Sequence, residues 1–322
     1  MEHHNSPLVS IVIPTHNRLS YLRECLSSAL AQTYEHIEVI VCDNASTDGT
    51  KDYLQHLGDP RVKYVRHDLP IPPLENWNSW TPTAAGDLAT FLPDDDKLEP
   101  RFVEACVREF SEKSDTVLVK AGCFIIDVDS KVVSRYLPFK DCTSGVQYVL
   151  DRINPRYSEL SLGSGYLFKR RDFVAMGGFV YTGFPQLHTV DDYLWFRIAL
   201  LGGVVRYVNE ELWDYRSHPS NMARVRGLRD FEDCYKAYVP MLRGLLEGRL
   251  PAGGRIDAYL ADEFTKSQMS ARILFELSRC RSDTLSRSFV FIKSNNAIIR
   301  QYFGLTRLIY EVAINLASRV VR

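Results

Sequence analysis

The sequence predicts an α/β fold in which helices cover a mainly parallel sheet, followed by a helical C-terminal region. Over residues 9–92, short β-branched apolar runs alternate with longer amphipathic segments. This alternation is typical of strands that are joined by crossover helices. From about residue 228 onward the strand-like runs disappear, and the long amphipathic segments that follow indicate helices.

The N-terminal part predicts the order β-α-β-α-β-α-β. Strands are expected at residues 9–14, 38–42, 62–65 and 88–92. Helices are expected at residues 20–32, 47–57 and 74–85. Because each crossover helix returns the chain to the same end of the sheet, the four strands are expected to be parallel.

Residues 100–215 have a mixed character. Pro100 is expected in the first turn of a helix, and two strands are expected near residues 117–128 and 131–137. A glycine-rich passage follows at residues 162–179. Residues 189–203 predict a helix that begins at acidic residues and ends at two glycines, and a short strand is expected at residues 204–208.

Polar segments follow three of the predicted strands. They are PTHNR at 14–18, DNASTDGT at 43–50 and PDDD at 93–96. Parallel sheets bind ligands beyond the carboxyl ends of their strands. Neighbouring carboxylates repel each other unless water or a cation screens them. The three segments therefore predict one ligand site, and PDDD indicates either a metal site or a solvated turn.

Composition and charge exclude several classes of protein. The 322 residues are 45% hydrophobic and carry a net charge of -1, so we expect one large or two smaller domains and no nucleic-acid partner. The 7 cysteines form no CxxC pair, which argues against a disulfide scaffold or a zinc knuckle. We see no signal peptide and no apolar run of about 18 residues, so a cytoplasmic protein is expected.

Seven segments carry a resemblance to a known family, in its order and spacing, across roughly residues 8–225. They are VSIVIPTHNR, CLSSALAQTY, EVIVCDNASTDGT, AAGDLATFLPDDD, GYLFKRRDFVAMGGF, VDDYLWFRIALLGG and WDYRSHPSNMAR. The chain resembles the inverting GT-A glycosyltransferases of the bacterial family 2 type. The resemblance implies a Rossmann-like GT-A catalytic domain at residues 1–225 and a separate helical region at residues 226–322.

The resemblance also implies an activity. This is the metal-dependent transfer, with inversion, of a sugar from a nucleotide-sugar donor to a hydroxyl acceptor. The acceptor would be a glycan, glycolipid or glycoprotein, as in surface polysaccharide assembly. The implied cofactor is Mn²⁺ or Mg²⁺, which neutralises the leaving diphosphate.

The implied metal site is a DXD-like motif at Asp94, Asp95 and Asp96. In many relatives the first aspartate of this motif falls where this chain has Pro93. Asp95 is therefore the expected metal ligand, Asp94 is expected to face the ribose, and Asp96 is either a second ligand or a structural cap. His218 is expected to contact the metal or the diphosphate, and a surface histidine is the alternative.

The implied nucleoside site lies at the ends of the first three strands. Pro14, Thr15 and Asn17 follow the first strand, and Thr15 is expected to line the nucleoside. Asp43 is expected to accept a hydrogen bond from a base N–H, which favours UDP and then dTDP. An Asx turn is the alternative for Asp43. Arg66 is expected to reach the base or a phosphate, or to form a surface ion pair.

An acidic pair begins the helix after the glycine-rich passage. The resemblance implies that Asp191 is the base that deprotonates the acceptor hydroxyl. Asp192 is expected to cap the helix or to contact a sugar hydroxyl. A helix N-cap without a catalytic role is the plain alternative for both residues. Arg18, in contrast, is left as either a site residue or a residue on the surface of the first helix.

The C-terminal region predicts helices at residues 258–277 and 306–321. The second has an apolar stripe flanked by arginines, which suits peripheral contact with the inner face of a membrane. Packing inside the protein or a homodimer contact is the more common use of such a stripe.

Two other functions are compatible with parts of the sequence. A degenerate GT-A domain that only binds sugar or nucleotide is the main alternative, and Pro93 supports it. A nucleotidyltransferase would need a glycine-rich phosphate loop after the first strand, and a dehydrogenase would need GxGxxG there. The segment PTHNR has neither.

Overall fold

The computed structural model describes residues 6–138, 140–152, 163–181, 190–218, 221, 228–249 and 269. The chain divides into two compact units, one of residues 1–149 and 161–221 and one of residues 150–160 and 222–322. The boundary expected at residue 225 stays a prediction. The helices expected at 258–277 and 306–321 lie outside the described residues, apart from Met269. Among the helices described, none has the length and apolarity needed to cross a bilayer.

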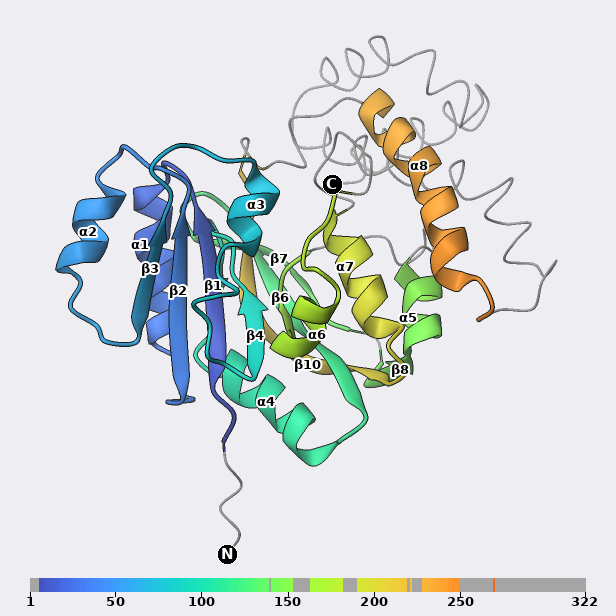
Figure 1. The fold of residues 1–322 in the computed structure, drawn as a ribbon. Coiled ribbons are helices and arrows are strands. Elements are labelled where there is room, and N and C mark those ends of the chain that lie inside the picture. The colour runs from blue at the N-terminus through green and yellow to red at the C-terminus, as the bar shows by residue number, and fades with distance from the viewer. Residues whose placement is uncertain are drawn as a thin grey trace, which may run out of the picture. The chain divides into compact units, whose positions relative to one another are not determined.

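The first unit contains a mixed sheet whose strand order is β3-β2-β1-β4-β9-β6-β10-β5, with β7 beside β6 and β8 beside β10. Six strands run in one direction: β1 (Val9–Thr15), β2 (Ile37–Asp43), β3 (Val62–Arg66), β4 (Leu88–Phe91), β6 (Thr116–Ile126) and β10 (Val204–Arg216). Four run in the opposite direction: β5 (Lys97–Leu98), β7 (Val132–Tyr136), β8 (Cys142–Ser144) and β9 (Tyr166–Lys169). Figure 1 shows β3, β2, β1 and β4 side by side.

One face of the sheet carries a mainly aliphatic core. Alternate residues of the strands, such as Val9, Ile11 and Ile13, point to this face and are fully buried. The helices that contribute to this core are α1 (Leu19–Leu30), α2 (Thr50–His56) and α4 (Phe102–Glu112). These helices therefore hold the carboxyl ends of the first strands in fixed positions.

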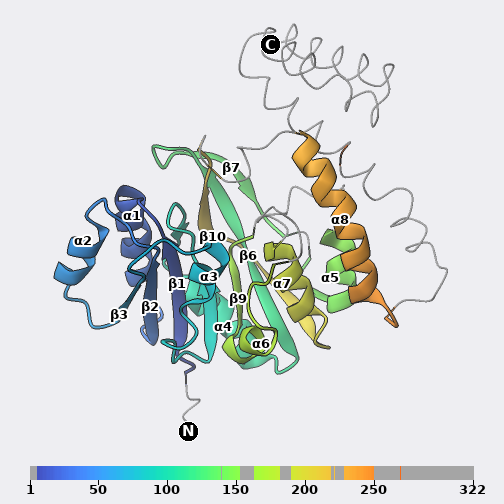
Figure 2. The ribbon, with the colours of Figure 1, turned by 45° about the horizontal axis from the view of Figure 1, so that its top comes forward.

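The other face is mainly aromatic. Phe91 on β4 and Phe168 on β9 stack with ring centroids 5.7 Å apart, and Phe173 and Trp195 pack against Phe168. The helices near this core are α3 (Pro73–Asn78), α6 (Arg170–Ala175) and α7 (Val190–Ala199). Figure 2 shows α3, α6 and α7 from a second direction. Two further helices are α5 (Gly145–Arg152) and α8 (Leu228–Leu246).

The predicted β-α-β-α-β-α-β order is confirmed over residues 9–91. Three details differ. Helix α3 ends at Asn78 instead of residue 85, because the residue before Pro82 is disfavoured in a helix and the chain then turns. Strand β10 continues to residue 216. A central strand, β9, lies inside the glycine-rich passage, where no strand was expected.

Candidate active site

The polar segments after β1, β2 and β4 meet at one edge of the sheet, as their positions predict. Thr15 Oγ1 donates to Asp94 Oδ2 at 2.8 Å, which joins the end of β1 to the segment after β4. The amide of Asn44 donates to the carbonyl of Thr15 at 3.0 Å, which joins the end of β2 to the end of β1. The two contacts connect residues that lie 79 positions apart (94 minus 15) and 29 positions apart (44 minus 15) in the chain.

The acidic turn, Pro93–Asp96, is a tight turn closed by a hydrogen bond from the amide of Asp96 to the carbonyl of Pro93 at 3.0 Å. Its three carboxylate residues are buried, with exposed fractions of 2–8%. The carboxylates are therefore removed from water, and the solvated turn that the sequence left open does not form.

Two basic side chains approach the acidic turn. Arg18, just before α1, donates to Asp95 Oδ2 at 2.7 Å and to Asp94 Oδ1 at 3.3 Å. His218 Nε2 lies 2.9 Å from Asp95 Oδ2, and the His218 ring stacks on Tyr21 of α1. Arg18 thus belongs to the candidate site and is not only a surface residue of the first helix.

Asp96 faces the end of β10 instead. Its Oδ1 accepts a hydrogen bond from the backbone N–H of Arg216 at 2.9 Å, and the residue is 2% exposed. This contact matches the structural cap that the sequence offered as one role for Asp96. Its neighbour Asp95 is the residue of the acidic turn that contacts both Arg18 and His218.

Burial and mutual repulsion separate the pKa values in the acidic turn. Burial, together with the charge of Asp95, raises the pKa of Asp94 to about 7. The same two causes raise the pKa of Asp96 well above its usual range. For Asp95, burial is outweighed by the hydrogen bond to His218 and by the charges of Arg18 and His218, so its pKa is lowered. Asp95 is therefore the carboxylate that stays ionised, as a metal ligand must.

The geometry of Asp95 and His218 fits a divalent ion. Two neighbouring ligand atoms of an octahedral ion with bonds of about 2.1 Å lie about 3 Å apart, and these two atoms are 2.9 Å apart. In the part of the chain that is described, no group of three or more His, Cys, Asp or Glu side chains could hold an ion alone. Mg²⁺ is commonly held by one or two carboxylates and by substrate phosphates, so the pair suits an ion that a diphosphate completes.

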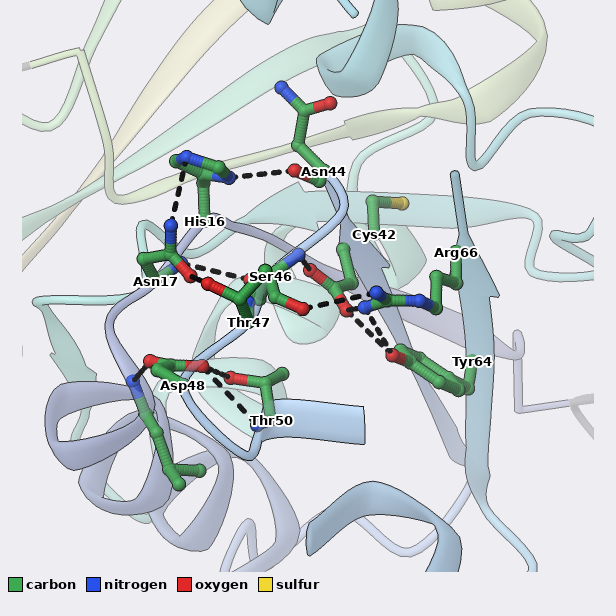
Figure 3. A network of polar contacts seen from close by, with 12 residues as sticks. His16, Asn17, Cys42, Asn44, Ser46, Thr47, Asp48, Thr50, Tyr64 and Arg66 are labelled. Carbon is green, nitrogen blue, oxygen red and sulfur yellow. Dashed lines mark hydrogen bonds and ion pairs between the residues drawn. The ribbon is translucent and has the colours of Figure 1, made fainter. Parts of the chain in front are cut away.

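Asp43, at the end of β2, lies in a second polar network (Figure 3). The side chain is fully buried, and its pKa is lowered because hydrogen bonds from Ser46, Tyr64 and Arg66 outweigh burial. Tyr64 Oη donates to Asp43 Oδ2 at 2.6 Å, and Arg66 forms an ion pair with the same oxygen. Arg66 thus meets a buried carboxylate, which differs from the surface ion pair that the sequence offered.

The loops after β1 and β2 are tied together in the same region, as Figure 3 shows. Asn17 Oδ1 accepts from the amide of Thr47 at 2.7 Å, and the amide of Asn17 donates to Ser46 Oγ at 2.9 Å. Asn17 and Ala45 have positive φ angles of 53° and 59°, a conformation that costs energy for residues other than glycine. Pro14 is half-buried within β1, opposite Cys42 of β2.

Asp191 and Asp192 lie in the first turn of α7 and are both half-buried. The Asp191 carboxylate packs against Gly163, where an added Cβ atom would overlap Oδ2. Trp195, one turn further along α7, is 1% exposed and donates from Nε1 to the carbonyl of Gly163 at 2.9 Å. Trp195 therefore belongs to the core, as its helix pattern indicates, and it fixes the backbone beside Asp191.

The structure thus places the predicted site residues in three groups. Thr15, the acidic turn and His218 form one hydrogen-bonded group. Asp43 and Arg66 form a second, and the two aspartates of α7 lie beside Gly163. Two participants were not identified from the sequence, Tyr64 and Arg216. A tyrosine and an arginine at alternate or terminal strand positions carry no signal until their neighbours are known.

Comparison with known proteins agrees with this architecture. Residues 10–164 match the family model for glycosyl transferase family 2. The chondroitin synthase of Pasteurella multocida (strain Pm70) is 38% identical over 135 residues, a match that covers 41% of this chain and 14% of the synthase. The chain therefore spans only a small part of that relative.

Two solved structures share the fold at low sequence identity. S. aureus TarS 1-349 in complex with UDP-GlcNAc has a TM-score of 0.62 at 16% identity, with 92% of this chain and 81% of that chain covered. Mannosyltransferase PcManGT from Pyrobaculum calidifontis, in complex with GDP-Man and Mn²⁺, has a TM-score of 0.56 at 17% identity, with 97% and 88% covered. The expected GT-A fold is thereby confirmed. Residues 10–164 are similar to glycosyl transferase family 2, in agreement with the resemblance that the sequence carries.

Proposed function

We propose that the protein transfers a sugar from a nucleotide-sugar donor to a hydroxyl group of a glycan, glycolipid or glycoprotein acceptor, with inversion and with a divalent ion. The single observation that carries this proposal is the buried acidic turn at the carboxyl edge of β1, β2 and β4. There Asp95 meets both Arg18 and His218. Three buried carboxylates in one turn are costly unless positive charge offsets them, and a divalent ion would supply that charge and would also bind a diphosphate.

The proposed donor site uses the acidic turn and the residues around it. Mn²⁺ or Mg²⁺, when bound, would neutralise the charge that develops on the leaving diphosphate. Asp95 and His218 would hold the ion, and Asp96 would fix the turn from behind. Arg18 has a side chain that is 31% exposed, so it can turn from the carboxylates to a phosphate oxygen. Asp94, hydrogen-bonded to Thr15, would face the ribose.

The proposed base site is the Asp43 group. Asp43 accepts hydrogen bonds from Ser46, Tyr64 and Arg66. A carboxylate has about four acceptor positions, and these are all used because Ser46 donates from both its backbone and its side chain. The ring N–H of uracil or thymine would therefore replace one of these donors. Cytosine has no such N–H donor. The expected donor nucleotide is therefore UDP, followed by dTDP, and the TarS complex with UDP-GlcNAc supports this order.

The proposed general base is Asp191. Inversion requires the acceptor hydroxyl to attack from the face opposite the leaving group, and it must lose its proton to a nearby base. Asp191 is half-buried at the first turn of α7 and held against Gly163, which limits its motion. Asp192 would contact a sugar hydroxyl or cap the helix.

A donor screen tests this proposal. We expect the protein to release nucleoside diphosphate from one UDP-sugar or dTDP-sugar in the presence of Mn²⁺. The product should have the anomeric configuration opposite to that of the donor. Asp191→Asn should lower kcat by about a hundredfold or more, the usual range for loss of a general base, and leave the nucleotide affinity unchanged.

The matched control is Asp52→Asn, which changes an exposed aspartate on α2 and should leave kcat unchanged. Retention of configuration would contradict the inverting mechanism. If no donor is hydrolysed or transferred although a nucleotide binds, the chain would instead be a GT-A protein that only binds its ligand.

A further inference from the structure

Arg216, the last residue of β10, lies directly behind the acidic turn and is 1% exposed. Its backbone N–H donates to Asp96 Oδ1 at 2.9 Å, and its Nε donates to the carbonyl of Asp95 at 2.8 Å. Arg216 therefore holds both the side chain of Asp96 and the main chain of Asp95. Among the described contacts, the Arg216 side chain forms no hydrogen bond with the carboxylate of Asp95. That carboxylate contacts Arg18 and His218 instead.

The far end of the same guanidinium reaches two other elements. Its Nη2 donates to Glu24 Oε2 on α1 at 2.7 Å. Its Nη1 donates to Ser130 Oγ at 2.9 Å, in the turn between β6 and β7. Ser130 Oγ in turn donates to Glu24 Oε2 at 3.1 Å. The three side chains form a closed triangle, so the guanidinium is held at both ends.

This arrangement needs the shape of arginine. A guanidinium is a rigid planar fork with five N–H donors, while a lysine ammonium is a single point on a flexible stem. Hydrogen bonds from a charged donor are stronger than neutral ones, and they fix direction as well as distance. A lysine at position 216 could keep the charge, but it could not bond to the acidic turn, α1 and the β6–β7 turn together.

We infer that Arg216 is a positioning residue for the donor site. It fixes the acidic turn against α1 and the β6–β7 turn, so that Asp95 meets the metal–diphosphate end of the donor without rearrangement. Glu24 and Ser130 act by holding the guanidinium. This inference rests on the proposed function, because it assigns a role in binding the same metal–nucleotide pair.

The test is a Mn²⁺ titration of the full-length protein in saturating UDP, with the shift in unfolding temperature as the readout. Arg216→Lys should raise the Mn²⁺ concentration at half-maximal shift by about tenfold, as expected when charge-assisted hydrogen bonds that orient a ligand are lost. The maximal shift should return at high Mn²⁺. The control is Arg101→Lys, whose partner is Glu210 in an exposed ion pair, and it should not change the midpoint.

A second variant covers the case in which Arg216→Lys fails to fold. Glu24→Ala combined with Ser130→Ala removes the outer anchors only, and the Glu24 side chain is 48% exposed, so folding should be retained. This double variant should raise the Mn²⁺ midpoint about threefold. The guanidinium keeps its Nε bond to the Asp95 carbonyl, but at its far end it keeps only the longer Nη1 bonds to the carbonyls of Asp127 and Val128, at 3.4 and 3.3 Å, so it is held less firmly.

The outcomes separate the two proposals. A lower unfolding temperature with an unchanged Mn²⁺ midpoint in both variants would show a purely structural role and overturn the inference alone. If the native protein shows no Mn²⁺-dependent shift with UDP or any other nucleoside diphosphate, the proposed function is overturned and this inference with it.

Discussion

At the scale of single residues, the chemistry depends on the protonation states of the three buried carboxylates in the acidic turn. Burial raises the pKa of Asp94 to about 7 and raises that of Asp96, while Arg18 and His218 keep Asp95 ionised. The three carboxylates are thus not equivalent. Asp95 is ionised and can bind a cation. Asp94 has a pKa of about 7, and Asp96 accepts a hydrogen bond from the backbone of β10.

Gly163 gives a residue-scale prediction about Asp191. Its φ angle is not positive, so alanine can adopt its backbone conformation, but the added methyl group would overlap Asp191 Oδ2. We expect Gly163→Ala to lower kcat by about ten- to hundredfold, because small displacements of a catalytic group have effects of this size. Steady-state kinetics and a UDP titration should show this loss with an unchanged nucleotide affinity.

The control for this change is Gly244→Ala in α8, where an added Cβ atom meets nothing within 4 Å. Replacing a helical glycine by alanine should stabilise the protein by up to about 1 kcal/mol and leave kcat unchanged. A Gly163→Ala protein with native kcat would argue that Asp191 does not act on the acceptor.

At the scale of elements, a buried carboxylate connects the strands that lead to the site. Glu38 on β2 is 5% exposed and accepts hydrogen bonds from Ser10 on β1 at 2.6 Å and from the amide of Ala85 at 2.7 Å. Its other oxygen pairs with Lys63 on β3 at 2.6 Å. Glu38 thus fixes the segment that enters β4, and β4 leads directly into the acidic turn.

This contact predicts a pH-dependent stability. Burial alone would raise the pKa of Glu38, but the hydrogen bonds from Lys63, Ser10 and two backbone amides outweigh it and lower the pKa. A lowered pKa stabilises the folded state above the unfolded value of about 4.3, and this contribution is lost as the pH falls through the folded pKa. Glu38→Gln should therefore reduce the free energy of unfolding at pH 7 by about 1–2 kcal/mol and have less effect near pH 3.5.

Urea unfolding at pH 7, 5 and 3.5 measures this difference. Glu104→Gln is a suitable control, because Glu104 is exposed and contacts only the Thr33 hydroxyl among the described side chains. It should change the free energy of unfolding by less than about 0.5 kcal/mol. A Glu38→Gln effect that stays constant over this pH range would show that the carboxylate charge is not involved.

The elements that could be predicted from the sequence are those with regular local patterns. Strands β1 to β4 are short β-branched runs separated by amphipathic helices, so their order and direction follow from the pattern. Strand β9 could not be predicted, because it has only four residues and lies among glycines. Its place between β4 and β6 is decided by long-range pairing. Helix α3 ends at Asn78, seven residues before its expected end, although Pro82 is a local signal that the chain leaves the helix there.

At the scale of the whole chain, the acidic residues of the site can be predicted from the sequence more readily than the basic residues. Acidic residues at the carboxyl ends of parallel strands must meet, whatever the details of packing. The basic side chains that face them, Arg18 and His218, come from the start of α1 and from the segment after β10, and they lie 200 positions apart (218 minus 18). Nothing local distinguishes Arg216 from the exposed arginines of the chain. Its role depends on burial and on the neighbours that the fold provides.

The family match and most of the described residues belong to the first unit. The matched segment, residues 10–164, contains the acidic turn and the Asp43 group, which are the parts proposed to bind the donor nucleotide. The proposed base Asp191 and His218 lie after the matched segment. Donor binding is therefore the central claim, and it can be tested before any acceptor is known.

The most direct test is thermal unfolding of the native protein and of Asp95→Ala with UDP, dTDP, GDP and CMP, each with and without Mn²⁺. A ligand that binds only the folded state raises the unfolding temperature, and the rise grows with the ratio of the ligand concentration to its Kd. We predict stabilisation by UDP, or next by dTDP, that requires Mn²⁺ and is absent in Asp95→Ala. Stabilisation that is independent of Mn²⁺ and unaffected by Asp95→Ala, or no stabilisation by any nucleotide, would contradict the assignment of the acidic turn as the metal–nucleotide site.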